Sequence, residues 1–328
     1  MAVRISWTDL GTIISGEDII SDLAYLEKGI VLAGSGPNGR IARSADYGLT
    51  WTDLGIIISG ETYIFSLAYL GNGIVLAGTY PNGKIARSTN YGLTWSDLGT
   101  IISGESDIEC LAYLGNGIVL AGGIGTGNIA RSADYGLTWT DLGTIISGEG
   151  ILSLAYLGSG IALASTYPNG KIARSADYGL TWSDLGIIIS GETFIECLAY
   201  LGGLTVLAGT YPNGKIARST DYGLTWSDLG TIIAGETDIF SLAYLGNGIV
   251  LAGTAVNGKI ARSADYGLTW TDLGTIISGE TYIECLAYRR GGVVLAGTYP
   301  NGKIARGIIY RTQGNPNVDQ LIFQHVID

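Results

Sequence analysis

The chain has 328 residues, of which 47% are hydrophobic and only 14% are charged. That apolar content can fill a large core, and it excludes a disordered chain. The formal net charge of −11 disfavours binding to phosphate backbones and anionic lipid, so we expect neither a nucleic acid nor a membrane as a partner. The 52 glycines follow no three-residue period, which excludes a collagen-like chain.

The N-terminus and the cysteines bear on the cellular compartment. Residues 1–10 show no apolar stretch typical of a signal peptide, and the apolar runs are far shorter than the ~20 residues that span a bilayer. Cys110, Cys197 and Cys285 occupy one repeat position on alternate blades, so we expect buried thiols rather than a disulfide framework. Unpaired thiols are compatible with the cytoplasm, but the sequence leaves the compartment open.

The tryptophans mark an internal repeat. All seven lie 43 or 44 residues apart, at Trp7, Trp51, Trp95, Trp139, Trp182, Trp226 and Trp270. A period of roughly 40–50 residues is typical of propeller blades with four strands. No segment has a sustained 3.6-residue apolar period with caps, so we expect almost no helix. The sequence therefore predicts an all-β fold, a seven-bladed β-propeller of four-stranded antiparallel blades.

One repeat unit shows the expected elements in chain order. Residues 51–54 form a short strand and residues 55–61 a loop; residues 63–70, rich in aromatic and branched side chains, form the next strand. A Gly-Asn-Gly turn leads into an apolar strand at 74–78, as expected when both faces are covered. In the following turn, residues 80–83, proline presets φ at the second position and glycine adopts a left-handed conformation at the end. Residues 84–87 form the next strand.

Six blades end in the pattern Ser-x-Asp-x-Gly-x-Thr-Trp, first at residues 44–51. The short side chain at its third position can accept backbone N–H groups and fix the turn; this structural residue is Asp46, Asn90, Asp134, Asp177, Asp221 or Asp265. Over roughly residues 1–306, the chain resembles the Asp-box (bacterial neuraminidase repeat) propellers. That family includes sialidases, xyloglucanases, sortilin-type receptors and a photosystem II assembly factor, so the resemblance implies a blade and not an activity.

The two ends of the repeat complement each other. The first repeat starts at Trp7 without an Asp box, and the last ends at Arg306 without one. We therefore expect residues 3–10 to complete the last blade and to close the ring of a monomer. The domain is residues 1–306, followed by a C-terminal extension at 307–328. In the extension, residues 307–311 extend the final strand, residues 321–323 form a docking segment, and His325 is a solvated tail residue.

The sequence indicates no catalytic centre. A single histidine excludes a Ser-His-Asp triad in the propeller and a multi-histidine metal site, and no nucleotide or calcium loop is present; we expect no cofactor and no metal. Arginine and glutamate recur on every blade, which favours blade-building roles over an unlike catalytic pair. These sets are Arg43, Arg87, Arg131, Arg174, Arg218, Arg262 and Arg306, and Glu17, Glu61, Glu105, Glu149, Glu192, Glu236 and Glu280.

Most of the variation between blades falls on one mouth of the ring, where propellers commonly bind partners. Four tyrosines beside Asn-Gly turns can stack on sugars while the asparagines and neighbouring lysines donate hydrogen bonds, which suits a multivalent glycan. These candidates are Tyr80, Tyr167, Tyr211 and Tyr299 with Asn82, Asn169, Asn213 and Asn301. We place Glu109, Glu196 and Glu284 at the channel mouth, where they either hold a cation or are solvated.

Three functions follow from these observations. The first is a non-catalytic binding or scaffold propeller for a glycan or a protein, recognised at the face with the Tyr-Pro-Asn-Gly turns. The second is a glycoside hydrolase related to sialidases or xyloglucanases, which would need unlike carboxylates in one pocket. The third is a recently amplified or designed repeat with no evolved ligand, in which the blade differences would line no cleft.

Overall fold

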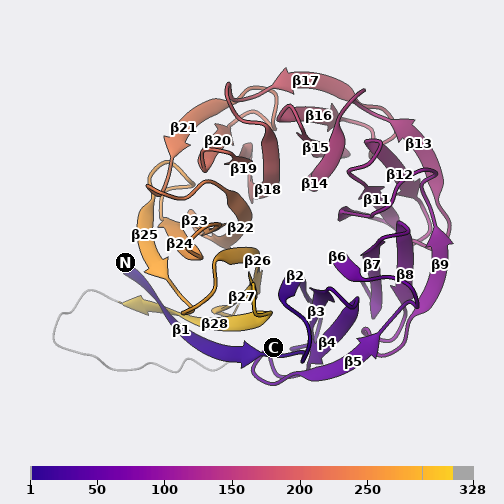
Figure 1. The fold of residues 1–328 in the computed structure, drawn as a ribbon. Coiled ribbons are helices and arrows are strands. Elements are labelled where there is room, and N and C mark those ends of the chain that lie inside the picture. Colours follow the sequence, from indigo (N-terminus) through magenta and orange to yellow (C-terminus); the bar gives the residue numbers. More distant parts are fainter. Residues whose placement is uncertain (1, 290, 313–328) are drawn as a thin grey trace.

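The computed structural model describes residues 2–289 and 291–312. These residues form seven four-stranded antiparallel sheets arranged as blades around one axis (Figure 1). The predicted seven-bladed all-β propeller is therefore confirmed. In this part of the chain, no helix has the length and apolar character needed to cross a membrane.

The strands occupy four radial positions. The innermost are β2 (Ile19–Tyr25), β6 (Tyr63–Gly71), β10 (Cys110–Gly115), β14 (Gly150–Gly158), β18 (Phe194–Gly202), β22 (Ile239–Gly246) and β26 (Tyr282–Arg289). The second are β3 (Val31–Gly36), β7 (Ile74–Tyr80), β11 (Ile118–Gly122), β15 (Ile161–Tyr167), β19 (Thr205–Tyr211), β23 (Ile249–Thr254) and β27 (Val293–Tyr299). The third are β4 (Arg40–Ser44), β8 (Lys84–Ser88), β12 (Asn128–Ser132), β16 (Lys171–Ser175), β20 (Lys215–Ser219), β24 (Lys259–Ser263) and β28 (Lys303–Thr312). The outermost are β5 (Thr52–Ile56), β9 (Ser96–Thr100), β13 (Thr140–Thr144), β17 (Ser183–Ile187), β21 (Ser227–Thr231), β25 (Thr271–Thr275) and β1 (Ala2–Thr12).

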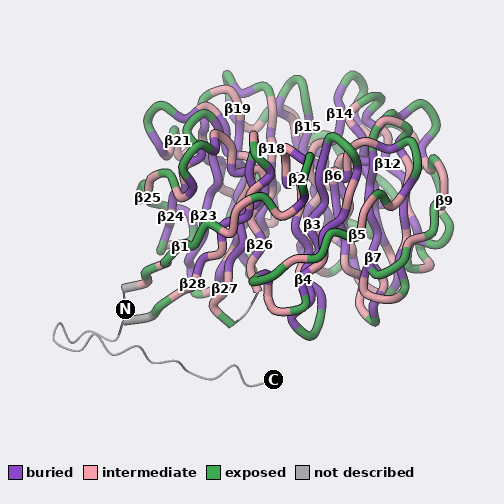
Figure 2. The backbone as a smooth tube through the Cα atoms, turned by 60° about the horizontal axis from the view of Figure 1, so that its bottom comes forward, coloured by how far each residue is buried: buried purple, intermediate pink, exposed green. Residues whose placement is uncertain are grey.

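The core lies between the blades. The second strand of each blade is buried on both faces, which explains its continuous apolar sequence; Val75, Leu76 and Ala77 of β7 are fully buried. The outermost strands carry the exposed Thr-Asp or Ser-Asp pairs (Figure 2). Each of the seven apolar clusters joins two adjacent blades. The ring therefore depends on every blade having both neighbours.

The ring closes through the predicted N-terminal strand. β1 pairs antiparallel with β28, from Ala2 opposite Thr312 to Thr12 opposite Lys303, and gives the sheet order β1-β28-β27-β26. Residues 307–311 extend the final strand, as predicted, since β28 runs to Thr312. Residues 307–312 therefore belong to the last blade and not to an extension outside the repeat. The proposed docking segment at 321–323 and His325 lie outside the described residues.

The Tyr-Pro-Asn-Gly turns differ from the expectation in one respect. The peptide bond before the proline is cis in the four Tyr-Pro-Asn-Gly turns, at Pro81, Pro168, Pro212 and Pro300, and also at Pro37 of the Gly-Pro-Asn-Gly turn, whereas the predicted turn has a trans bond. Gly83 is left-handed, as expected, with φ of +57°. A Cβ there would lie 2.8 Å from the backbone oxygen of Glu105 on the next blade, so the repeat needs glycine for close packing as well.

Each Ser-x-Asp-x-Gly-x-Thr-Trp segment, which we call an Asp box, is a turn, and in five of the six it is organised around one carboxylate. Oδ1 of Asp46 accepts hydrogen bonds from Ser44 Oγ (2.7 Å), Leu49 N (3.1 Å) and Thr50 N (2.8 Å), and Oδ2 accepts Thr50 Oγ1 (2.6 Å). Burial opposes ionisation, but these hydrogen bonds outweigh it and lower the pKa of Asp46 to about 2. Asn90 keeps the same turn by donating Nδ2 to Thr94 Oγ1 at 2.8 Å.

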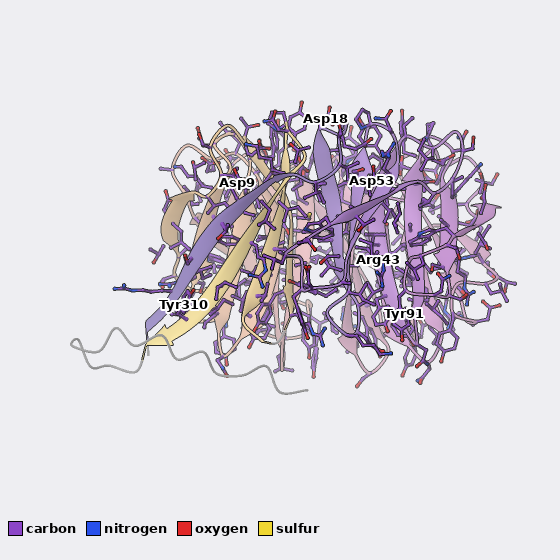
Figure 3. All side chains as sticks on the ribbon, turned by 90° about the horizontal axis from the view of Figure 1, so that it is seen from below. Asp9, Asp18, Arg43, Asp53, Tyr91 and Tyr310 are labelled. Atoms are coloured by element: carbon purple, nitrogen blue, oxygen red, sulfur yellow. The ribbon has the colours of Figure 1, made fainter. Side chains whose placement is uncertain are left out.

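The Asp boxes also join neighbouring blades. Arg43 of the first blade donates Nε to the backbone oxygen of Tyr91, in the Asp box of the second blade, at 3.1 Å (Figure 3). The next residue, Gly92, is left-handed and presses on Leu32 of the first blade, where a Cβ would lie 2.6 Å from Cδ1. Trp95 donates Nε1 to Gly92 O at 3.0 Å. The arginine on every blade thus has a structural contact.

Candidate binding face

One face of the ring carries the start of the innermost strands and the Tyr-Pro-Asn-Gly turns. The strand register brings them together, because Tyr63 pairs with Tyr80 and Tyr282 with Tyr299. We call this face the tyrosine face. Asp18, which immediately precedes β2, lies at this end of the ring, whereas Tyr91 of an Asp box lies towards the other end (Figure 3).

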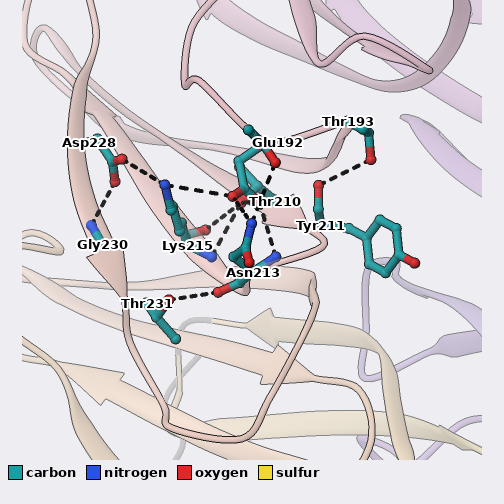
Figure 4. A network of polar contacts seen from close by, with 10 residues as sticks. Glu192, Thr193, Thr210, Tyr211, Asn213, Lys215, Asp228, Gly230 and Thr231 are labelled. Atoms are coloured by element: carbon teal, nitrogen blue, oxygen red, sulfur yellow. Dashed lines mark hydrogen bonds and ion pairs between the residues drawn. The ribbon is translucent and has the colours of Figure 1, made fainter.

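A buried glutamate anchors each Tyr-Pro-Asn-Gly turn. Glu192 is 4% exposed, and its Oε2 accepts Thr210 Oγ1 at 2.7 Å and the Asn213 backbone N at 3.2 Å (Figure 4). Its Oε1 accepts Asn213 Nδ2 at 2.7 Å and lies 3.7 Å from Lys215 Nζ. That ammonium also lies 3.0 Å from Asp228 Oδ2. Both oxygens of this glutamate are therefore engaged within its own blade.

The same contacts recur at the other three turns proposed as glycan sites. Asn82, Asn169 and Asn301 donate Nδ2 to Glu61, Glu149 and Glu280 at 2.6 to 2.7 Å. The asparagine amides, expected to donate to a ligand, are instead used to hold the turns. The sequence did not reveal this role because the glutamate lies 20 or 21 residues before its asparagine.

The tyrosines of these turns are partly packed and partly open. Tyr80, Tyr167 and Tyr299 are 37 to 38% exposed, and Tyr211 is half-buried. Each contacts an aromatic ring that starts an innermost strand. The ring centroids are 6.0 Å apart for Tyr63 and Tyr80, 4.4 Å for Tyr167 and Phe194, 5.0 Å for Phe194 and Tyr211, and 5.4 Å for Tyr282 and Tyr299. The tyrosines therefore belong to aromatic clusters that also contain Phe65 and Phe240.

Glu109, Glu196 and Glu284 lie on three non-adjacent innermost segments. Glu196 and Glu284 occupy β-bulges, which turn an extra side chain out of the ladder. Desolvation, with a smaller contribution from neighbouring carboxylates, raises the pKa of Glu109 and of Glu196 to about 8 and that of Glu284 to about 7. Glu196 and Glu284 belong to innermost strands and Glu109 directly precedes one, so all three lie at the inner side of the ring.

The described residues give no support to the hypothesis that these glutamates hold a cation. Within residues 2–289 and 291–312, no group of three or more histidine, cysteine, aspartate or glutamate side chains is arranged to hold a metal ion. A raised pKa keeps a carboxyl group partly protonated near neutral pH, and a protonated carboxyl donates a hydrogen bond. These three side chains can therefore act as neutral donors near the axis.

The cysteine position is a bridge between blades. Cys197 donates Sγ to Ile239 O at 3.2 Å and Cys285 donates to Ile20 O at 3.3 Å, each on the following blade. Ser66 makes the equivalent contact with Ile108 O at 3.3 Å. Cys110 differs, since its Sγ lies 3.8 Å from Gly122 O of its own blade. All three cysteines are buried and free, as the sequence predicted.

Comparison with known proteins places the fold. No family model matches the chain, and no curated protein matches it. Among solved structures, YCF48 bound to D1 peptide is 18% identical with a TM-score of 0.75, covering 92% of this chain and 96% of that one. YCF48 from Cyanidioschyzon merolae is 15% identical with a TM-score of 0.73, covering 92% and 98%.

A catalytically inactive virginiamycin B lyase from Staphylococcus aureus with quinupristin is similar to the same degree. It is 15% identical with a TM-score of 0.77, and the match covers 93% of this chain and 99% of that one. At these identities a likeness carries the fold and no activity. The chain is thus a seven-bladed β-propeller of four-stranded antiparallel blades.

Proposed function

We propose that this chain is a non-catalytic binding propeller of the Asp-box type, which recognises a polypeptide segment on its tyrosine face. The observation that carries the proposal is the unequal set of side chains on that face. At two repeat positions, aromatic and acidic residues replace one another from blade to blade. The first position holds Tyr63, Phe194 and Tyr282 or Asp107 and Asp238, and the second holds Phe65 and Phe240 or Glu109, Glu196 and Glu284. An unsymmetrical set of contacts suits an extended, unsymmetrical ligand.

The polar contacts favour a polypeptide over a repeated sugar. The asparagine and lysine donors that a lectin would use at each turn are occupied by the buried glutamates. Aromatic rings remain partly exposed, and aromatic side chains are enriched at protein interfaces. Partly protonated carboxyl groups such as Glu109 can donate hydrogen bonds to backbone carbonyls of a peptide.

The same contacts weaken the glycoside hydrolase alternative. A catalytic pair needs two carboxylates in unlike environments that face a sugar. The glutamates on every blade are buried and accept hydrogen bonds inside their own turn, as Glu61 does from Thr79 at 2.7 Å. Their role in holding the turns supports a non-catalytic scaffold.

Binding to a peptide array tests the proposal. A variant with Phe65→Ala, Tyr80→Ala and Phe240→Ala alters the tyrosine face, and one with Leu137→Ala and Leu180→Ala alters exposed Asp-box leucines as a matched control. We expect sequence-dependent binding by the parent and the control, and a loss of at least about tenfold in the first variant.

A glycan array run beside it separates the alternatives. Glycan binding without peptide binding by a folded parent would contradict a polypeptide ligand and return the lectin hypothesis. Silence on both arrays would contradict the proposal and favour an amplified repeat with no evolved ligand. Circular dichroism of each variant shows that lost binding does not reflect unfolding.

A further inference from the structure

The junction between the seventh and first blades departs from the repeat on the tyrosine face. Asp18 occupies a position that holds threonine on four blades, at Thr62, Thr193, Thr237 and Thr281, and serine at Ser106. Gly36 occupies the position of Tyr80, Tyr167, Tyr211 and Tyr299. These two changes lie together, because Asp18 donates its backbone N to Gly36 O at 3.0 Å.

The backbone of Asp18 is held between the two blades. Its N–H bonds to Gly36 of its own blade, and its carbonyl accepts Gly302 N of the seventh blade at 2.7 Å. At the equivalent position, Thr281 donates Oγ1 to Tyr299 O at 3.5 Å. The Asp18 carboxylate, in contrast, accepts no hydrogen bond from any residue that the structure describes, and the residue is half-buried. The junction therefore presents an unpaired carboxylate on a residue whose backbone is held between two blades.

Aromatic rings flank this charge. The ring of Tyr63 covers Gly36 so closely that a Cβ on the glycine would lie 2.1 Å from Cδ1. Tyr63 stacks on Phe65, with centroids 5.3 Å apart and planes 20° apart. Because residue 36 is glycine, the ring of Tyr63 can extend over the first blade towards Asp18.

The seventh blade supplies the other side. Tyr299 packs against Tyr282 there and is 37% exposed. Gly302 bonds the turn that carries Tyr299 to Asp18. Desolvation raises the pKa of Tyr63, and Asp18, Tyr299 and Tyr80 contribute to the rise. One carboxylate and aromatic rings from two different blades therefore share one place on the face.

A carboxylate beside aromatic rings is the chemistry that recognises an organic cation. Arginine suits it best, because its planar guanidinium can stack on a ring while it pairs with a carboxylate. The net charge of −11 also draws cationic segments to the protein. We propose that the site formed by Asp18, Gly36, Tyr63 and Tyr299 binds one cationic side chain, preferably arginine, of the polypeptide bound on the tyrosine face.

This inference rests on the proposed function, and its test uses a substitution that the repeat already tolerates. Asp18→Thr restores the residue of four other blades, so the variant should fold. Glu27→Gln on the opposite face removes the same charge and serves as the control. Peptides found on the array are measured with arginine, lysine, citrulline and alanine at each basic position. We expect Asp18→Thr to weaken the arginine peptide at least tenfold and to leave the citrulline peptide unchanged.

The inference would be overturned if Asp18→Thr weakened the arginine and citrulline peptides equally. It would also be overturned if replacing arginine by citrulline lowered the affinity of the parent at no basic position of the peptide. The site can also be judged if no peptide binds and the proposed function fails. Acetyl-arginine amide is then titrated while the tyrosine ring signals are followed by NMR. Saturable shifts of Tyr63 in the parent, absent in Asp18→Thr and absent with acetyl-citrulline amide, support a cation site; no shift in the parent rejects it.

Discussion

Six junctions between blades carry an Asp box, including that between the seventh and first blades, where Arg306 donates to Tyr47 O. They differ from the junction between the sixth and seventh blades, which we call the closing junction because the seventh blade contains β1. At an Asp-box junction, an arginine, a tryptophan and a glycine all contact one turn, as Arg43, Trp95 and Gly92 do. The seventh blade has no such turn, because β1 continues its pairing with β28 through Trp7 opposite Gly307 and on to Ala2 opposite Thr312. The sixth blade therefore contacts strand β1, through Arg262 and Val3, where the other blades contact an Asp box.

The closing junction leaves two donors without their usual acceptors. Among the described residues, Trp7 Nε1 and Arg262 Nε are buried and have no hydrogen-bond partner. Arg262 instead donates Nη1 to Val3 O. An unpaired buried donor costs about 1–3 kcal/mol. Strand β1 thus takes the place of an Asp box at this junction but leaves Trp7 Nε1 and Arg262 Nε without an acceptor.

Removal of the closing strand should have the largest effect. Deletion of residues 1–10 exposes the edge of β28 and removes Val3, Ile5 and Trp7 from the cluster between the last two blades. We expect a melting temperature at least about 10 °C lower, or aggregation, by calorimetry and light scattering. A truncated chain that stays monomeric and melts like the parent would contradict closure by β1.

Glycine substitutions measure the packing of an Asp box. Gly92 and Gly99 share a φ of +79°, but a Cβ at Gly92 meets Leu32 whereas one at Gly99 has no atom within 4 Å. Gly99→Ala should cost about 1–2 kcal/mol through its backbone conformation alone. Gly92→Ala should cost about 1–3 kcal/mol more because of the clash. Urea unfolding gives both values, and equal costs would mean that the turn does not press on its neighbour.

Tryptophan substitutions compare the two kinds of junction directly. Trp226→Phe removes the hydrogen bond of Nε1 to Gly223 O, which is 3.0 Å long. Trp7→Phe removes a donor that has no such partner. The free energy of unfolding should therefore fall by about 1 kcal/mol more for Trp226→Phe, at similar loss of ring area. A larger loss at Trp7 would show that its indole N–H is satisfied in solution.

Acid should affect the Asp boxes and spare the closing ladder. The pKa of Asp46 is lowered to about 2, so the folded state binds fewer protons than the unfolded state between about pH 4 and pH 2. Its stabilisation is complete above about pH 4 and is lost as the pH falls through about 2. NMR should show the Thr50 amide titrating near pH 2 while Thr94, beside Asn90, stays constant. Parallel titration of both amides would contradict this assignment.

The fold and the closure could be predicted because they depend on period and on complementary ends of the chain. Trp7 and Arg306 mark those ends without any knowledge of contacts. The turn network could not be predicted in the same way, since Asn82 meets Glu61 only when the blade folds. The cis proline peptides also carry no local signal that separates them from trans ones.

The candidate site was only partly accessible from the sequence. Comparison of blades did single out the tyrosine turns and Gly36, but not their relation to Asp18. That relation depends on contacts between three blades: Tyr63 covers Gly36, and Gly302 holds Asp18. The sequence does contain a signal for this site, because Asp18 stands where the other blades that keep this position have threonine or serine.

The pairing of β1 with β28 also sets an order of events during translation. Among the strands of the propeller, β1 is synthesised first, and its partner β28 follows about 300 residues later. At roughly 5–20 residues per second, β1 waits about 15–60 s for that partner, while the blades between them can already form. Residues 7–17 have the same sequence as residues 139–149 of an internal blade. Nascent β1 therefore competes with an identical internal segment until the last blade emerges, and the ring closes only after β28 has been synthesised.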